Sequence, residues 1–284
     1  LMPAPLGPRR SRRPRRSPVL RWLALSLLAP WAVAPLPLGA TAPAKRLSAS
    51  PPSACPAPAR AAQVPPADPG DAAPATRWRW DAARVLILGN SLTLHPASAE
   101  LDWPGEWGMA ASSADRDYVH RLAARLQQAT GQPPTLRVRN IFEFERGYTT
   151  YDFAQAHAAD RDFRPTLIVL AIGENMEPLA SDHAEQRFYR AVCQLLDELT
   201  RAQPATVVVR SGFWRSPRRD RALASAACAS GGLFVDCGDL GAIPEYAARS
   251  ERDFRHAAVG AHPGDRGMAA IADRIWQRLK QEHD

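Results

Sequence analysis

The chain has 284 residues, a formal net charge of +7 and a pI of about 9.7. The excess charge lies in residues 1–76, which contain ten Lys and Arg against two Asp, whereas residues 77–284 contain 26 basic and 27 acidic residues. No packed core would use the composition of the basic segment, so only the remainder is expected to fold. The balanced charge of residues 77–284 excludes a basic nucleic-acid-binding surface on the folded part, and we expect no nucleic-acid partner.

Residues 1–40 have the pattern of a signal peptide: an Arg-rich start, an apolar stretch at 22–40, and small residues suited to cleavage. A transmembrane anchor is the alternative, but Pro30, Pro35 and Pro37 would break its helix and leave carbonyl groups unpaired in lipid. We therefore expect a periplasmic or secreted protein that meets the membrane only transiently, through this segment. The export route stays open.

Residues 41–76 consist mainly of Pro, Ala and Ser, which predicts a disordered, extended linker ahead of a folded domain at 77–284. Cys55 lies in this linker, but Pro52 stands where a lipidation signal needs an apolar residue, so lipidation is not expected.

The cysteine content indicates no metal site, because no pair has the spacing of metal ligands. An oxidising compartment would allow one disulfide, and the sequence does not select its pairing. We expect no metal and no organic cofactor. The four cysteines are Cys55, Cys193, Cys228 and Cys237.

From residue 77 onward, short apolar runs alternate with longer helical periods. Continuous runs of β-branched residues and Leu predict strands buried on both faces. Apolar stripes at 188–199 and 268–279 predict helices, and Asp182 with Glu185 predicts a capping box for the first. The sequence thus predicts a three-layer α/β/α domain with a five-stranded parallel sheet in flavodoxin-like order. The apolar runs are 85–88, 136–138, 167–170, 207–209 and 233–235.

Polar residues follow the first and third of these strands, where Ser91 and Asn175 stand. Ligands bind beyond the carboxyl ends of parallel strands, so neighbouring strands would place these two side chains across one crevice. His262 precedes the last helix and is held by Pro263, with Asp265 available to cap that helix. Each feature alone is compatible with an ordinary turn or cap. Together, at one edge of one predicted sheet, they indicate a catalytic site.

These segments resemble the sequence blocks of the SGNH, or GDSL-like, hydrolase family. Residues 85–91 (VLILGNS) are similar to the first block, with Asn90 in place of the usual Asp, and 173–176 (GENM) are similar to the third. Gly108 resembles the glycine of the second block, and His262-Pro263 resembles the fifth. The resemblance extends over about residues 84–281.

The resemblance implies an esterase in which Ser91 is the nucleophile and His262 its base. It also implies an oxyanion hole formed by the Ser91 N–H, the Gly108 N–H and the side-chain amide of Asn175. Such donors stabilise the tetrahedral intermediate of acyl transfer.

The family's usual Asp three residues before the catalytic histidine is absent, because Val259 stands there. A second candidate pair, Asp253 and His256, lies just upstream but lacks the following proline and helix. We keep His262 as the base. Its imidazole would then be oriented by a backbone carbonyl, by Asp253 or by Glu174.

The substrate is less well defined by the sequence. Trp103 and Trp107 precede Gly108, and Tyr148 and Tyr151 follow the second strand. Aromatic faces beside a hydrolytic centre suit sugar rings, although both Trp residues could instead wedge a long loop onto the domain. We expect an acyl ester, preferably acetyl, of a glycan or small molecule.

Two alternative functions remain at this stage. A lipase or thioesterase would use the same residues with an apolar acyl channel. A catalytically weak glycan-binding relative would keep the fold without turnover, and both Asn90 and Val259 make that alternative a serious one. The acyl group and the oligomeric state are not determined by the sequence.

Overall fold

The computed structural model describes residues 81–282. In them the five predicted strands form one parallel sheet in the order β2-β1-β3-β4-β5, so the predicted strands and flavodoxin-like order are confirmed. The strands are β1 (Arg84–Gly89), β2 (Thr135–Asn140), β3 (Leu167–Ala171), β4 (Thr206–Arg210) and β5 (Leu233–Val235).

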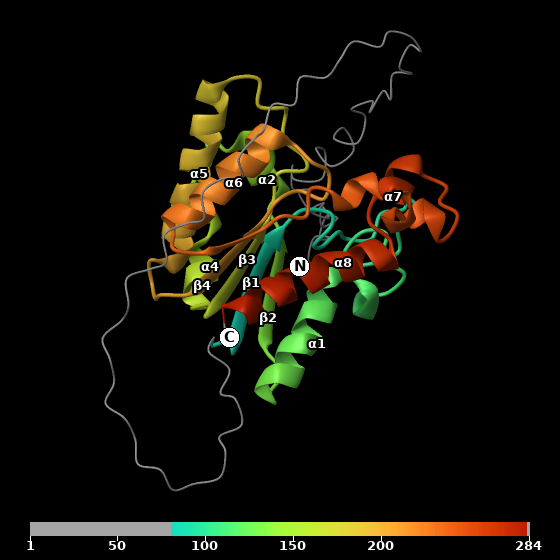
Figure 1. Cartoon of the computed structure of the whole chain (residues 1–284), viewed down its shortest axis with the longest axis horizontal. Coiled ribbons are helices and arrows are strands. Elements are labelled where there is room, and N and C mark those ends of the chain that lie inside the picture. The colour runs from blue at the N-terminus through green and yellow to red at the C-terminus, as the bar shows by residue number, and fades with distance from the viewer. Residues whose placement is uncertain (1–80, 283–284) are drawn as a thin grey trace, which may run out of the picture. The chain divides into compact units, whose positions relative to one another are not determined.

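Helices cover both faces of the sheet, as Figure 1 shows. On one face α1 (Tyr118–Thr130) and α8 (Asp265–Gln281) pack together, and on the other α5 (Asp182–Thr200) packs against α6 (Pro217–Ala229). The remaining α-helices are short: α2 (Phe142–Gly147), α3 (Phe153–Ala156), α4 (Ala158–Asp162) and α7 (Ala257–Ala261).

The alternation of side chains along β1 explains why its sequence is apolar throughout. Val85 and Ile87 belong to the core that contains the apolar stripe of α8, whereas Leu86 and Leu88 belong to the core that contains the stripe of α5. All four side chains are fully buried, as expected for a central strand covered on both faces. The pairing of Gly89 with Ala171 brings the ends of β1 and β3 to the same edge of the sheet.

Two helix caps differ from the sequence-based expectation. Helix α5 begins at Asp182, and Ser181 is its N-cap, with Oγ accepting from the Ala184 N–H at 3.2 Å. The predicted capping box was therefore wrong, because Asp182 lies one residue inside the helix, where it pairs with Arg218. Ser181 has the extended backbone of an N-cap residue, with φ −147° and ψ 163°, and its hydroxyl satisfies a free N–H group of the first turn.

Helix α8 is capped by a residue from another segment. The carboxylate of Glu251 accepts from the N–H groups of Asp265 and Arg266 at 2.8 and 2.9 Å. Asp265 instead accepts two hydrogen bonds from Ser112, at 2.7 and 2.6 Å, so it does not cap the helix as predicted. It ties the loop before α1 to the start of α8.

The predicted signal peptide at 1–40, the linker at 41–76 and Cys55 lie outside the described residues. Within 81–282, no helix is both long and apolar enough to cross a membrane. Cys193 and Cys237 are free thiols, and burial raises the pKa of Cys237 to about 12.

Candidate active site

Ser91 and His262 lie in hydrogen-bond contact, although 171 positions separate them in the chain. The distance between Ser91 Oγ and His262 Nε2 is 2.9 Å. Ser91 is placed by β1, which ends two residues earlier, and His262 by the junction of α7 and α8. This is the contact that a serine nucleophile and its general base require.

The backbone around His262 is fixed from two sides. Its N–H donates to the Val259 carbonyl at 3.0 Å, and its carbonyl accepts from the Ala248 N–H at 2.8 Å. The Trp214 ring also meets the imidazole edge-to-face, with 6.1 Å between ring centroids. The imidazole is therefore held in a defined position rather than on a loose turn.

The second ring nitrogen of His262 is oriented by a backbone carbonyl. Nδ1 lies 2.8 Å from the Ala258 oxygen, which can only accept, so Nδ1 carries the proton and Nε2 presents its lone pair to Ser91. Neither Asp253 nor Glu174 makes this contact, so the structure selects the first of the three predicted alternatives. Burial lowers the pKa of His262 to about 4, with the Ala258 bond acting in the opposite direction.

The rival histidine has a different place. His256 is the N-cap residue of α7, and its buried Nδ1 has no hydrogen-bond partner among residues 81–282. It lines a pocket together with Asp253. Among the described residues, the side chain bonded to Ser91 Oγ is His262.

Asn175 stands at the same edge of the sheet as Ser91, four residues beyond the end of β3. The turn that leads to it passes through Gly173, whose φ of +111° is a conformation that favours glycine. Both the backbone N–H and the side-chain Nδ2 of Asn175 donate to Glu145 Oε2, each at 2.7 Å. An amide nitrogen carries two hydrogens, so the second remains available for a substrate oxygen.

Gly108 is placed beside Ser91, but its N–H is already engaged. It donates to Asp117 Oδ2 at 3.1 Å, and a Cβ at Gly108 would lie 2.5 Å from the Leu92 carbonyl oxygen. Close packing against that carbonyl therefore explains the glycine. The predicted role of this N–H as an oxyanion donor would require the bond to Asp117 to break.

Two backbone N–H groups near the Ser91 hydroxyl are without an acceptor in the described part of the chain. They belong to Ser91 itself and to Ala110, which has a left-handed φ of +71°. Met109, between Gly108 and Ala110, donates its N–H to the Ser91 carbonyl at 2.8 Å. Unpaired N–H groups at a nucleophile suit an incoming oxyanion.

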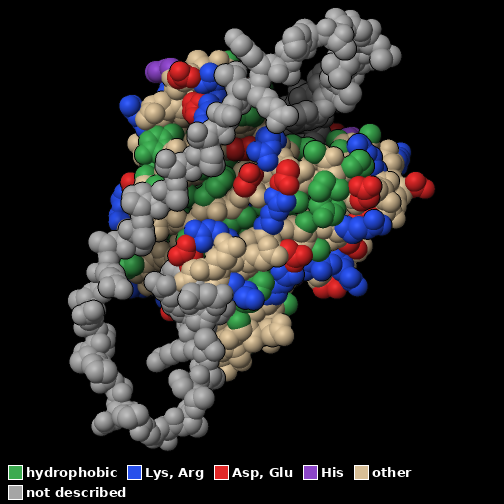
Figure 2. Space-filling view, in the orientation of Figure 1, with side chains coloured by type: hydrophobic (Ala, Val, Ile, Leu, Met, Phe, Trp, Pro, Cys, Tyr) green, Lys and Arg blue, Asp and Glu red, His purple; other side chains and the backbone are tan. Residues whose placement is uncertain are grey.

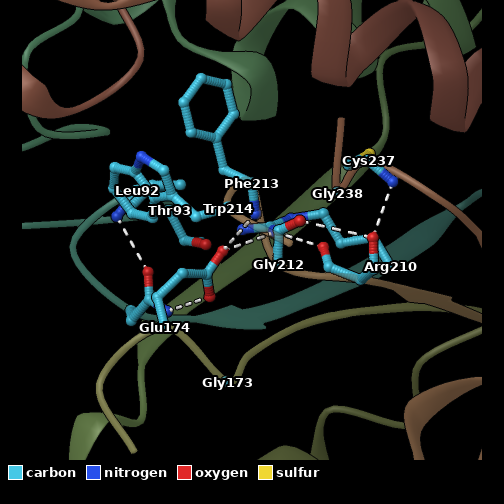
Figure 3. A network of polar contacts seen from close by, with 12 residues as sticks. Leu92, Thr93, Gly173, Glu174, Arg210, Gly212, Phe213, Trp214, Cys237 and Gly238 are labelled. Carbon is cyan, nitrogen blue, oxygen red and sulfur yellow. Dashed lines mark hydrogen bonds and ion pairs between the residues drawn. The ribbon is translucent and has the colours of Figure 1, made fainter. Parts of the chain in front are cut away.

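A buried polar network lies under the site, and Figure 3 shows its part around Glu174 and Arg210. Arg210 Nη1 donates to Glu174 Oε1 at 2.7 Å, and both side chains are almost completely buried. Burial alone would raise the pKa of Glu174, but the charges of Arg210 and Arg219 and the hydrogen bonds from Arg210 and Asn90 together hold that pKa below its ordinary value. Glu174 therefore stays ionised.

Sequence analysis did not identify Glu145 or Arg210 as site residues. One feature of the sequence could have indicated Arg210: it is a charged residue at the end of the apolar run that forms the buried strand β4. Glu145 lies in the short helix α2, where an acidic residue is most often exposed, so only the tertiary structure reveals its burial.

Trp103 and Trp107 line a cavity of about 200 Å³ together with the segment 252–256. Their rings meet edge-to-face at 5.5 Å, and their N–H groups donate to the carbonyls of His95 and Ala111 at 3.2 and 3.0 Å. These residues thus hold the loop together and also form a cavity wall.

Tyr148 and Tyr151 have no part in that wall. They pack against the core around Phe144, with ring centroids 6.4 and 5.3 Å from its own. The two tyrosines therefore do not belong to the aromatic wall that Trp103 and Trp107 form. Both rings pack instead against the apolar surface of α2.

The profile of the GDSL-like lipase/acylhydrolase family matches residues 87–270. This match covers more than half of the chain, and the sheet order and the paired Ser91 and His262 are consistent with it. The protein belongs to the GDSL-like lipase/acylhydrolase family.

Solved structures similar to this chain include three hydrolases. A GDSL-like lipase from Bacteroides ovatus has 14% identity and a TM-score of 0.47, over 71% of this chain and 100% of that one. The lipase/acylhydrolase from Enterococcus faecalis has 14% identity and a TM-score of 0.45, over 70% and 96%. A family two carbohydrate esterase from Cellvibrio japonicus has 20% identity and a TM-score of 0.40, over 71% and 61%. No curated protein matches the sequence.

Proposed function

We propose that the protein is a serine esterase in which Ser91 attacks the ester carbonyl and His262 is the general base. The observation that carries this proposal is the 2.9 Å contact between Ser91 Oγ and His262 Nε2, in a histidine whose Nδ1 is bonded to a carbonyl oxygen. This geometry gives Nε2 the lone pair that must accept the serine proton.

In the proposed reaction, His262 takes the Ser91 proton as Oγ bonds to the carbonyl carbon. The oxyanion is met by the Ser91 N–H, the Asn175 amide and the unpaired Ala110 N–H. His262 then returns the proton to the leaving alcohol, which gives an acyl-serine. Water, activated by the same Nε2, adds to the acyl group and releases the acid and Ser91.

A carbonyl in place of a carboxylate beside His262 has a chemical consequence. The Ala258 oxygen orients the ring, but it carries only a partial negative charge and stabilises an imidazolium less than a carboxylate would. His262 is thus a weaker base, in keeping with its low pKa. We propose moderate turnover that persists at mildly acidic pH.

For the alcohol part of the substrate we propose a single sugar residue or an alcohol of similar size. The cavity of about 200 Å³ is smaller than the roughly 300–1,000 Å³ typical of larger ligands. Its walls join the apolar faces of Trp103 and Trp107 to the polar side chains of Arg252, Asp253 and His256. Aromatic faces with polar groups suit a sugar ring better than an acyl chain.

The cavity walls belong to the segments that carry the site. Trp107 lies two residues before Met109, whose N–H holds the Ser91 carbonyl. His256 caps α7, whose C-cap residue is His262. A ligand in this cavity therefore contacts the segments that position the nucleophile and the base.

Export is a separate part of the proposal and rests on the pattern of residues 1–40 alone. Expression of the full gene in a Gram-negative host, followed by fractionation, tests it. Shortened protein in the periplasm or medium supports export. Full-length protein confined to the cytoplasm contradicts it.

The activity is tested with the full chain on p-nitrophenyl acetate, butyrate and octanoate and on acetylated monosaccharides, beside Ser91→Ala. We expect hydrolysis that is fastest for acetyl esters and is lost in the variant. Preference for octanoate would favour a lipase. A wild-type Ser91 that neither turns over esters nor reacts with a fluorophosphonate would favour a non-catalytic relative. Trp107→Ala should raise KM for the acetylated sugar more than for p-nitrophenyl acetate.

A further inference from the structure

Glu145 is a buried carboxylate at the centre of the candidate site. Its side chain, 1% exposed, projects from α2 toward the turn that follows β3. Each of its two oxygens accepts two hydrogen bonds, all between 2.6 and 2.8 Å. The donors are Asn90 Nδ2 and Gly173 N to Oε1, and Asn175 N and Asn175 Nδ2 to Oε2.

These contacts define the charge of Glu145. Every group that meets its oxygens is an N–H donor, so a proton on the carboxyl group would face another hydrogen and find no acceptor. Burial, and then the negative charge of Glu174, raise the pKa of Glu145. The four donors oppose this effect, because hydrogen bonds to a carboxylate favour its charged form. The geometry is that of an ionised carboxylate with its acceptor sites filled.

We propose that Glu145 is a positioning residue that orients Asn175 for the oxyanion. This inference rests on the proposed serine esterase function. The carboxylate holds Asn175 by its backbone and by one hydrogen of its side-chain amide. Because the backbone and the side-chain amide of Asn175 are both held, the second hydrogen of the amide points in a fixed direction. A fixed donor costs no reorganisation when the oxyanion forms, which is how such donors accelerate acyl transfer.

Asn90 connects this carboxylate to the rest of the buried network. Its Nδ2 lies 2.8 Å from Glu145 Oε1 and 2.7 Å from Glu174 Oε2, so each of its two hydrogens is bonded to a different carboxylate. Its Oδ1 accepts from the Leu92 N–H at 3.1 Å, one residue beyond the nucleophile. Asn90 thereby links Glu145 to the turn that carries Ser91.

The same contacts explain the departure from the usual Gly-Asp-Ser motif. An aspartate at position 90 would put a third negative charge against Glu145 and Glu174, and among the described residues Arg210 is the cation that forms an ion pair with these two carboxylates. An amide supplies two donors without charge. The amide of Asn90 therefore suits the ionised carboxylate of Glu145, whereas the carboxylate of an aspartate would repel it.

The test is a double-mutant cycle between Glu145 and Asn175 in the full-length protein. The kcat and KM for p-nitrophenyl acetate are measured for wild type, Glu145→Gln, Asn175→Ala and the double variant, with melting temperatures. Glutamine has the shape of glutamate, but in either orientation of its side-chain amide the NH₂ group faces two N–H donors. Glu145→Asp keeps the charge on a shorter side chain and is used in the same cycle if the glutamine variant does not fold.

A matched control is available in Glu198. It is also a buried glutamate, 2% exposed, but it lies near the C-terminal end of α5 and pairs with Arg161 and Arg201. Glu198→Gln should lower the melting temperature and leave kcat unchanged. It separates the loss of a buried carboxylate in general from the loss of the one that orients Asn175.

We expect Glu145→Gln to lower kcat by about tenfold to a hundredfold with KM within about threefold, as expected for a displaced catalytic donor. The double variant should be no slower than Asn175→Ala, because Glu145 acts through Asn175. Glu145→Asp should recover part of the loss. Wild-type kcat in Glu145→Gln, or losses that multiply in the double variant, would overturn the inference. Full activity in Ser91→Ala would instead overturn the proposed function itself.

Discussion

The Nδ1 of His262 lies 2.8 Å from the carbonyl oxygen of Ala258, a residue of the short helix α7. The family's usual aspartate would come from the next position, where Val259 is buried in the core instead. The imidazole is therefore oriented without a charged partner.

Removal of either Ser91 or His262 should abolish turnover to about the same level. The two side chains act as one unit, so the Ser91→Ala/His262→Ala double variant should be no slower than either single variant. The measurement is kcat/KM for p-nitrophenyl acetate. His256→Ala is the control and should cost about tenfold or less. An inactive His256→Ala beside an active His262→Ala would mean that the upstream pair, Asp253 and His256, performs the chemistry.

Asn175→Ala should lower kcat by about 10²–10³ and change KM little. Its amide is placed to act on the oxyanion, which forms only after the substrate has bound. Steady-state kinetics on one acetyl ester give both constants. A change confined to KM would show that Asn175 binds the ground state.

The acid limb of kcat/KM should lie near pH 4 rather than near 6.5. His262 must be neutral to accept the serine proton, and burial lowers its pKa to about 4. A pH–rate profile from 3.5 to 8, limited to conditions in which the protein stays folded, measures this limb. An inflection near 6.5 would mean that the imidazole is solvated in the working enzyme.

The same pKa predicts how stability depends on pH. The unfolded chain takes up a proton at His262 near pH 6.5, whereas the folded protein does so only near pH 4. The contribution of His262 is complete above pH 6.5 and is lost as the pH falls toward 4, by on the order of 3 kcal/mol. His262→Asn should flatten this part of the stability curve. An unchanged slope in urea titrations would assign it to other groups.

Asn90→Asp should destabilise the protein by about 2–4 kcal/mol at pH 8. The new carboxylate would face Glu145 and Glu174, which now accept the two hydrogens of Asn90. Protonation relieves that repulsion, so the difference in melting temperature from wild type should shrink at pH 5. A difference that grows on acidification would contradict the charge assigned to Glu145.

A protein consisting of residues 77–284 should fold cooperatively and keep the activity of the full chain. All strands of the sheet and both core clusters lie within 81–282. Thermal melts and ester hydrolysis of the two forms are the comparison. A truncated protein without a cooperative melt would mean that the preceding segment contributes to the fold.

The sequence by itself determined the architecture and the place of the candidate site residues in it. Runs such as 85–88 and 167–170 are apolar at every position. Strands of a parallel sheet that is covered on both faces have this pattern, and from it the sheet could be predicted. Ser91, Asn175 and His262 could be placed at its edge because strand ends are local features of the chain. Sheet geometry then brings such ends together.

Only the tertiary structure decided what surrounds those residues. The sequence cannot mark the carbonyl of Ala258, because every residue carries a carbonyl group. That this carbonyl orients His262, and Asp253 does not, depends on how α7 packs. The engagement of the Gly108 N–H with Asp117 and the burial of Glu145 depend in the same way on contacts between distant segments. Periodicity reports whether a side chain is buried. It does not report which donor a buried acceptor will meet, because that is set by packing in three dimensions.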